Sequence, residues 1–68
     1  MGEVFVMDSE KIRAAMHGQR WTITELSKRA GVSYQTTRRI LQKNNAMRIA
    51  NALKVADALG VQVEDLKA

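Results

Sequence analysis

The chain has 68 residues and contains neither cysteine nor proline. Without cysteine it can form no disulfide and no thiolate metal site, and nothing points to an oxidising compartment. Long apolar runs are also missing, since the four residues VFVM at 4–7 are too few for a signal peptide or a membrane span. We therefore expect one small cytoplasmic domain that has no room for a separate ligand-sensing unit, and so no small-molecule ligand.

Acidic residues are scarce in the middle of the chain. Between Lys11 and Lys54 lie ten of the eleven basic residues but a single acid, Glu25, whereas the other six acids lie towards the two ends. The net charge is +4 at pH 7. A concentrated basic segment is typical of a protein that binds a polyanion, although a small soluble protein can also acquire such a surface by chance.

The apolar residues follow a helical spacing from residue 8 onward. Asp8 or Ser9 can cap a first helix, which is expected to run to about His17 and to end at Gly18. The domain boundaries that follow are residues 1–8 for an N-terminal extension or short strand and residues 9–68 for the helical domain.

The second predicted helix carries the clearest local signals. Thr22 and Glu25 match the T-x-x-E capping box, in which each side chain accepts a hydrogen bond from an amide at the start of the helix. Trp21 and Leu26 occupy the two positions of a hydrophobic staple, which predicts that Trp21 belongs to the core. Gly31 then ends a helix of only about two turns.

Ser33 is placed to cap a third helix after a turn of about three residues. At roughly 100° per residue, one broad arc of this helix carries long polar or basic side chains and no acid. These side chains are Tyr34, Gln35, Arg38, Arg39 and Gln42. The opposite side, expected to face the core, carries Thr37, Ile40 and Leu41.

Asn44 and Asn45 are expected to break the third helix and to cap a fourth over about Ala46–Leu59. Its predicted apolar stripe consists of Ile49, Ala52, Leu53, Ala56 and Leu59. Gly60 ends this helix, and Val63 with Leu66 indicates a short fifth one. The expected fold is all-α, a compact bundle of four to five short helices that contains a helix-turn-helix.

This order of helices resembles a known family. The turn AGVS at 30–33 and the segment ALKVADALGVQVEDL at 52–66 are similar to the Cro/lambda-repressor (XRE) class of helix-turn-helix domains. The stretch AGVSYQT at 30–36, with Arg39 after it, also resembles the recognition helix of the lactose-repressor family. The resemblance covers nearly the whole chain and implies binding to double-stranded DNA, with the helix at 33–42 in the major groove.

Carried onto this sequence, the resemblance implies separate roles for the polar residues. The base-contacting residues would be Tyr34, Gln35 and Arg39. Thr22, Ser33 and Thr36 would donate to backbone phosphates, near helix N-terminal amides that also favour anions. Charge and position alone add three more candidates for backbone contact, Arg38, Lys43 and Arg48. Alternatively, the polar arc is a solvated helix face without a partner.

The sequence departs from the family pattern at three positions. Ile23 stands where many phage repressors have Gln, which removes one expected contact. Thr37 occupies a position that is usually aliphatic, so the core beneath the third helix is expected to be slightly polar. Gln62 replaces the usual Ser-like cap before the last helix.

The function that the resemblance implies is that of a small Cro-like repressor of phage or mobile-element type. Two copies on an inverted repeat are expected, joined through Val4–Met7 or through Val63 and Leu66. The alternatives are an excisionase-like factor that bends DNA and an antitoxin-type module that holds a protein partner. No catalytic constellation, metal spacing or phosphate-binding loop is present, so neither enzymatic activity nor a cofactor is expected.

Overall fold

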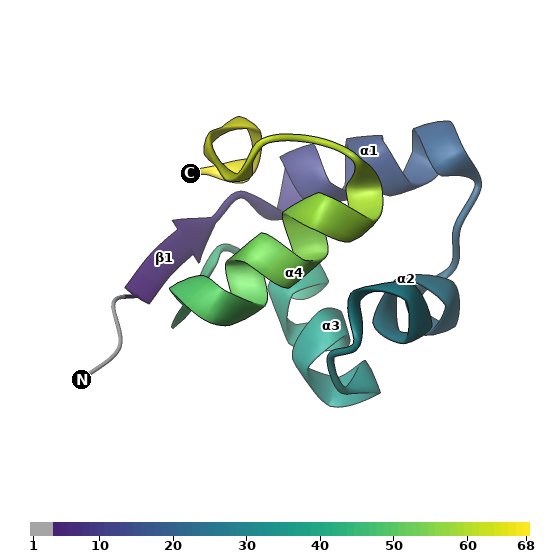
Figure 1. Ribbon diagram of the computed structural model, residues 1–68, viewed down its shortest axis with the longest axis horizontal. Coiled ribbons are helices and arrows are strands. Elements are labelled where there is room, and N and C mark those ends of the chain that lie inside the picture. The colour runs from purple at the N-terminus through teal and green to yellow at the C-terminus, as the bar shows by residue number, and fades with distance from the viewer. Residues whose placement is uncertain (1–3) are drawn as a thin grey trace.

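The computed structural model describes residues 4–68, apart from the side chain of Asn45. The described residues form four α-helices, one 3-10 helix and two short strands (Figure 1). In order they are β1 (Val4–Met7), α1 (Ser9–Gln19), α2 (Ile23–Ala30), α3 (Tyr34–Gln42), β2 (Asn45–Arg48), α4 (Ile49–Leu59) and the 3-10 helix η1 (Val63–Leu66). The all-α prediction is confirmed, with a small two-stranded sheet as an addition.

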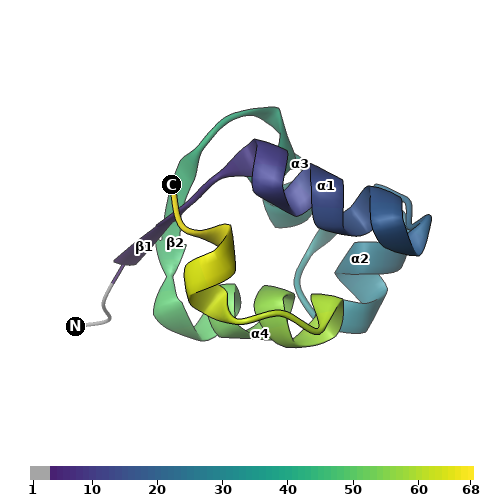
Figure 2. The same cartoon turned by 90° about the horizontal axis from the view of Figure 1, so that it is seen from above.

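Every element contributes to a single core. Figure 2 shows α1 and α4 along opposite sides of the domain, with α2 at one end and the two strands at the other. The buried apolar residues are Met7, Ile12, Met16, Leu26, Ala30, Ile40, Leu41, Met47, Ala52, Val55, Ala56, Leu59 and Leu66. Among the described residues no helix is long and apolar enough to cross a membrane.

The prediction that Gly18 ends the first helix is wrong. Helix α1 continues to Gln19, and Arg20 takes the left-handed conformation that ends it, with a φ of 60°. The N–H of Trp21 then donates to the carbonyl of Met16 over 3.0 Å. This later end directs the half-buried Trp21 against the core, so tertiary packing places the helix end and outweighs the local preference for glycine.

The predicted start of the fourth helix is also wrong. Residues 45–48 form β2, which pairs antiparallel with β1, and α4 begins only at Ile49. Asn44 does not cap α4, because its Oδ1 accepts a hydrogen bond from the N–H of Ser9 over 2.9 Å. Of the two forms predicted for the N-terminal segment, the strand is the one observed over residues 4–7; residues 1–3 lie outside the described part.

The buried stripe of α4 is rotated relative to the predicted one. Val55 is fully buried, although it was not predicted to face the core, whereas the side chain of Leu53 is 51% exposed. Because β2 replaces the first predicted turn, the face of α4 that meets the rest of the domain is centred on Ala52, Val55 and Ala56.

Thr22 caps α2 as predicted, but the capping box is incomplete. The Oγ1 of Thr22 accepts the N–H of Glu25 over 3.2 Å, but the carboxylate of Glu25 pairs with Arg29 Nε at 2.6 Å. Only one half of the predicted capping box is therefore formed in α2. The guanidinium of Arg29 also lies 4.7 Å from the centre of the Trp21 ring, which it covers.

At the C-terminal end, Gln62 forms a full capping box with Asp65, so the departure from a Ser-like cap is accommodated. Leu66 is only 2% exposed, and its carbonyl accepts the N–H of Asp8. The N–H of Ala68 donates to the carbonyl of Val6, which places the last residues along β1 on the edge away from β2.

Substitution by alanine should change the stability of the protein in opposite directions at two glycines that have equal space around them. A Cβ at Gly18 or Gly31 would meet nothing within 4 Å, but Gly18 lies inside α1 whereas Gly31 has a φ of +72°. We expect Gly18→Ala to raise the free energy of unfolding by about 0.5–1 kcal/mol, because alanine is the better helix former. Gly31→Ala should lower it by about 1–2 kcal/mol, the cost of a left-handed alanine.

Urea unfolding followed by circular dichroism measures both changes. If Gly18→Ala destabilised the protein as Gly31→Ala does, the placement of Gly18 inside α1 would be contradicted.

Candidate nucleic-acid interface

A tight turn joins α2 to α3. Gly31 adopts the left-handed conformation, and the carbonyl of Ser27 accepts both its N–H (2.9 Å) and the N–H of Val32 (3.2 Å). The Oγ of Ser33 then accepts the N–H of Thr36 over 3.1 Å and caps α3. The predicted three-residue turn is confirmed, and it fixes α3 relative to α2 as in a helix-turn-helix.

The face of α3 that packs on the core consists of Thr37, Ile40 and Leu41, as predicted. Thr37 is fully buried, and its hydroxyl donates to the carbonyl of Ser33 over 3.0 Å. The polar atom beneath α3 therefore has a partner within its own helix, which removes most of the cost of burying it.

The opposite face of α3 is open to solvent. Tyr34, at the start of the helix, is 49% exposed. A surface hollow of about 410 Å³ lies farther along and is lined by Gln35, Arg38, Arg39 and Gln42. The structure thus brings together the three predicted base-contacting residues, Tyr34, Gln35 and Arg39, on one exposed face without an acid.

The predicted phosphate-binding hydroxyls lie at two helix starts. Thr22 caps α2 and is exposed, while Ser33 and the half-buried Thr36 lie at the start of α3. The Oγ of Ser33 donates to Thr36 Oγ1 over 2.8 Å. The hydroxyl oxygen of Thr22 accepts the cap bond from Glu25, and that of Thr36 accepts the bond from Ser33. Since both oxygens act as acceptors, the protons of these two hydroxyls can be directed outward.

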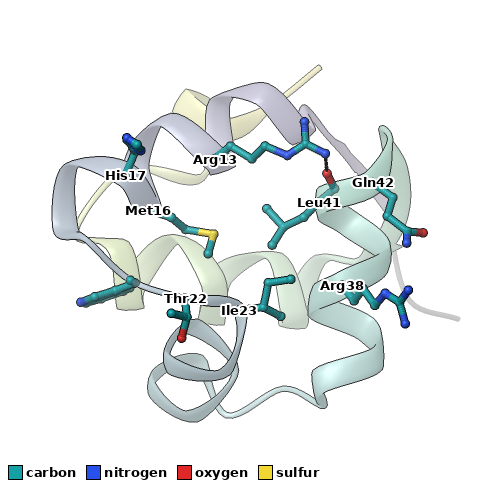
Figure 3. A pocket seen from close by; sticks show the side chains of 9 residues that line it. Arg13, Met16, His17, Thr22, Ile23, Arg38, Leu41 and Gln42 are labelled. Atoms are coloured by element: carbon teal, nitrogen blue, oxygen red, sulfur yellow. Dashed lines mark hydrogen bonds between the residues drawn. The ribbon is translucent and has the colours of Figure 1, made fainter.

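The three basic candidates for backbone contact lie in different places. Arg38 projects from α3 away from the helix bundle (Figure 3), and Lys43 directly follows α3. Arg48 lies at the end of β2, in the strand pair at the end of the domain away from α2 (Figures 1 and 2). Arg38 and Lys43 therefore lie on or directly after α3, whereas Arg48 lies in the strand pair.

A second hollow, of about 440 Å³, lies between α1, the start of α2 and α3. Met16, Ile23 and Leu41 point into it, and Arg13 spans it from α1 to donate to the carbonyl of Leu41 (Figure 3). Ile23, the departure from Gln, therefore serves as part of an apolar lining. The role of Arg13 was not predicted, because nothing in the sequence indicates a contact between residues 28 positions apart.

Among the described residues, no group of three or more His, Cys, Asp or Glu side chains could hold a metal ion. One ion pair is formed between described side chains, the exposed pair of Glu25 and Arg29. Glu25, the acid nearest to α3 in sequence, is thus engaged within α2.

Comparisons with solved structures find the same fold in a small part of dioxygenase chains and in most of a hypothetical transcription factor. A 2-hydroxyethylphosphonate dioxygenase variant superposes with a TM-score of 0.83 at 28% identity, over 91% of this chain and 15% of the dioxygenase. A second such dioxygenase variant gives a TM-score of 0.80 at 27% identity, over 91% and 13%. The chain therefore spans only about an eighth of that enzyme.

A hypothetical transcription factor from Neisseria superposes with a TM-score of 0.73 over 91% of this chain and 81% of that protein. At 21% identity this likeness shows the fold alone. No curated protein matches the sequence. The sequence model of the Cro/C1-type helix-turn-helix DNA-binding domain matches residues 11–67. The chain belongs to this family of DNA-binding domains, which is typical of transcription regulators.

Proposed function

We propose that the domain reads a specific DNA sequence as a Cro-like transcriptional repressor of phage or mobile-element type, with α3 in the major groove. The observation that carries the proposal is the exposed, acid-free face of α3, bordered by the capped N-termini of α2 and α3. In a helix-turn-helix the second helix meets the bases and the first crosses the backbone. We also propose that it acts in the cytoplasm, on the nucleoid.

The side chains of α3 provide complementary chemistry for base edges. The guanidinium of Arg39 can form two hydrogen bonds with guanine, and the amide of Gln35 can do the same with adenine. Tyr34, at the first position of α3, offers a ring for thymine methyl groups and a hydroxyl for polar edges. These assignments rest on the exposure of the α3 face and on the resemblance to the lactose-repressor recognition helix.

The backbone contacts would come from both helix starts and from the basic residues. Thr22 and Thr36 can donate hydroxyl protons to phosphates, with Ser33 holding Thr36 in place. Arg38 and Lys43 would add charge beside the groove. Such contacts fix the orientation of the protein on the duplex and make the affinity depend on salt.

The two alternatives differ from the repressor in what they require of the structure. An excisionase-like factor would use the same face, and the effect of binding on DNA bending distinguishes it from a repressor. An antitoxin-type module would need an apolar docking surface, whereas the exposed face of α3 is polar and basic. We propose a binding rather than a catalytic role for this domain.

We further propose that the domain binds an inverted repeat as a homodimer, since one small module buries only about 600–1,000 Å² on DNA. Of the two predicted dimer surfaces, the C-terminal one has less support, because Leu66 is buried and Val63 is half-buried. In the N-terminal one, Val4 and Val6 are 69% and 45% exposed, whereas Met7 is buried. The outer face of the strand pair, with Val4 and Val6, is therefore the proposed contact.

Selection of binding sites from random duplex DNA, repeated at several salt concentrations, tests the main proposal. We expect one preferred motif whose affinity falls steeply with salt. Recovery of no motif above random DNA contradicts sequence-specific binding.

Arg39→Ala should weaken the selected site by about 1–3 kcal/mol and relax the preference at one base position. Lys43→Ala should instead weaken all duplexes alike, because a phosphate contact carries no sequence information. Lys54→Ala, which removes an exposed charge from α4, is the matched control. Equal losses for Arg39→Ala on selected and random DNA would exclude a base contact.

The two roles assigned to Thr22 can be separated by Thr22→Asp. Aspartate also caps helices, so the free energy of unfolding should hold or rise, whereas Thr22→Ala should lower it by about 1 kcal/mol. The new carboxylate should weaken DNA binding through repulsion of the phosphate, as fluorescence anisotropy can measure. Gln62→Asp adds the same charge at the cap of η1, away from α3, and should bind normally (Figures 1 and 2). If both variants bound alike, the phosphate contact at Thr22 would be wrong.

Val6→Lys should abolish the proposed dimer in sedimentation while leaving the fold intact, because this side chain is exposed. Leu53→Lys, an equally exposed apolar position on α4, is the control and should remain dimeric. A wild-type protein that is monomeric both free and on DNA would rule out the dimer.

A further inference from the structure

Helix α3 ends differently from the other three α-helices. Helices α1, α2 and α4 are each followed by a residue in the left-handed conformation whose N–H bonds back to the helix: Arg20, Gly31 and Gly60. Lys43, which follows α3, is extended with a φ of −162°, so the chain leaves without turning back. No left-handed residue therefore caps the last carbonyls of α3.

One donor to these carbonyls comes from α1. The Nη2 of Arg13 donates to the carbonyl of Leu41, next to the last residue of α3 (Figure 3). The guanidinium brings a positive charge to the negative end of the helix dipole, which strengthens the contact. Arg13 thus takes the place of the missing left-handed cap.

This contact lies at the hollow between α1, the start of α2 and α3. The hollow is lined from both helices, by Met16 of α1 and Leu41 of α3 among others. Both side chains belong to the buried core, so packing and the bond from Arg13 hold this end of α3 together. The hydrogen bond from Arg13 crosses this space and joins the two helices directly (Figure 3).

We propose that Arg13 is a positioning residue that fixes the C-terminal end of α3 and thereby sets its base discrimination. This inference rests on the proposed function of α3. Two hydrogen bonds to one base edge require side chains held within about 0.5 Å of the correct geometry, whereas contacts with phosphates tolerate small shifts. Arg39 lies only two residues before Leu41, so a displaced helix end would affect sequence reading first.

The test uses a matched pair of substitutions in α1. Arg13→Met keeps an unbranched stem but removes the donor and the charge. Lys11→Met removes the same charge two residues earlier, together with a comparable bond, since Lys11 Nζ donates to the carbonyl of Lys67 over 2.9 Å. That bond holds the C-terminal end of the chain rather than α3. Arg13→Lys, which keeps the charge and a donor, tests for rescue.

Two measurements are made on each variant: the Kd for the selected site and for a scrambled duplex, and amide hydrogen exchange in the free protein. Arg13→Met should raise the Kd for the selected site about tenfold relative to Lys11→Met, with equal Kd values on the scrambled duplex. Exchange at Leu41 and Gln42 should be about tenfold faster in Arg13→Met alone. Arg13→Lys should recover part of both effects.

Other results would overturn the inference. An equal loss on both duplexes would make Arg13 a phosphate contact, and unchanged exchange at Leu41 and Gln42 would show that it does not hold the helix end. Faster exchange at every protected amide would show a global loss of stability instead. If the wild-type protein selects no site, the proposed function fails, and the exchange comparison still decides whether Arg13 holds α3.

Discussion

The carbonyl of Ser27 is the point on which the arrangement of the binding face depends. It accepts the N–H groups of both Gly31 and Val32, and this pair of bonds can form only when residue 31 is left-handed. The chain then turns within three residues, so α3 begins almost directly after the end of α2. The relative position of the two helices is thus set by the backbone, and the exposed side chains of α3 can vary without disturbing it.

The signals that predicted this part correctly are local ones. The caps at Thr22 and Ser33 and the turn at Gly31 each involve residues within five positions of one another. The face of α3 was predictable for the same reason, since helical periodicity separates Thr37 from its exposed neighbours. The roles of individual side chains at the DNA remain predictions, because the geometry of a bound duplex lies outside the free protein.

The features that were missed depend on distant parts of the chain. Residues 46–48 have an acceptable helical pattern, but pairing with β1, some forty residues earlier, makes them a strand. Because of that pairing, α4 begins later in the sequence than predicted, and its buried face is rotated so that Leu53 is exposed and Val55 is buried. Arg20 likewise ends α1 where Trp21 must meet the core, and Arg13 finds its acceptor 28 positions away. Propensity is a weak guide wherever such tertiary contacts decide.

The strand pair also explains how so short a chain leaves one helix face free for binding. A domain of this size has few apolar side chains, and all of its elements supply residues to one core. β1 joins the chain ends to that core, because Met7 is buried between β2 and the C-terminal residues that pair with β1. α3 needs only Thr37, Ile40 and Leu41 for its attachment. Most of its other side chains are exposed, and such a face can be specialised for a partner.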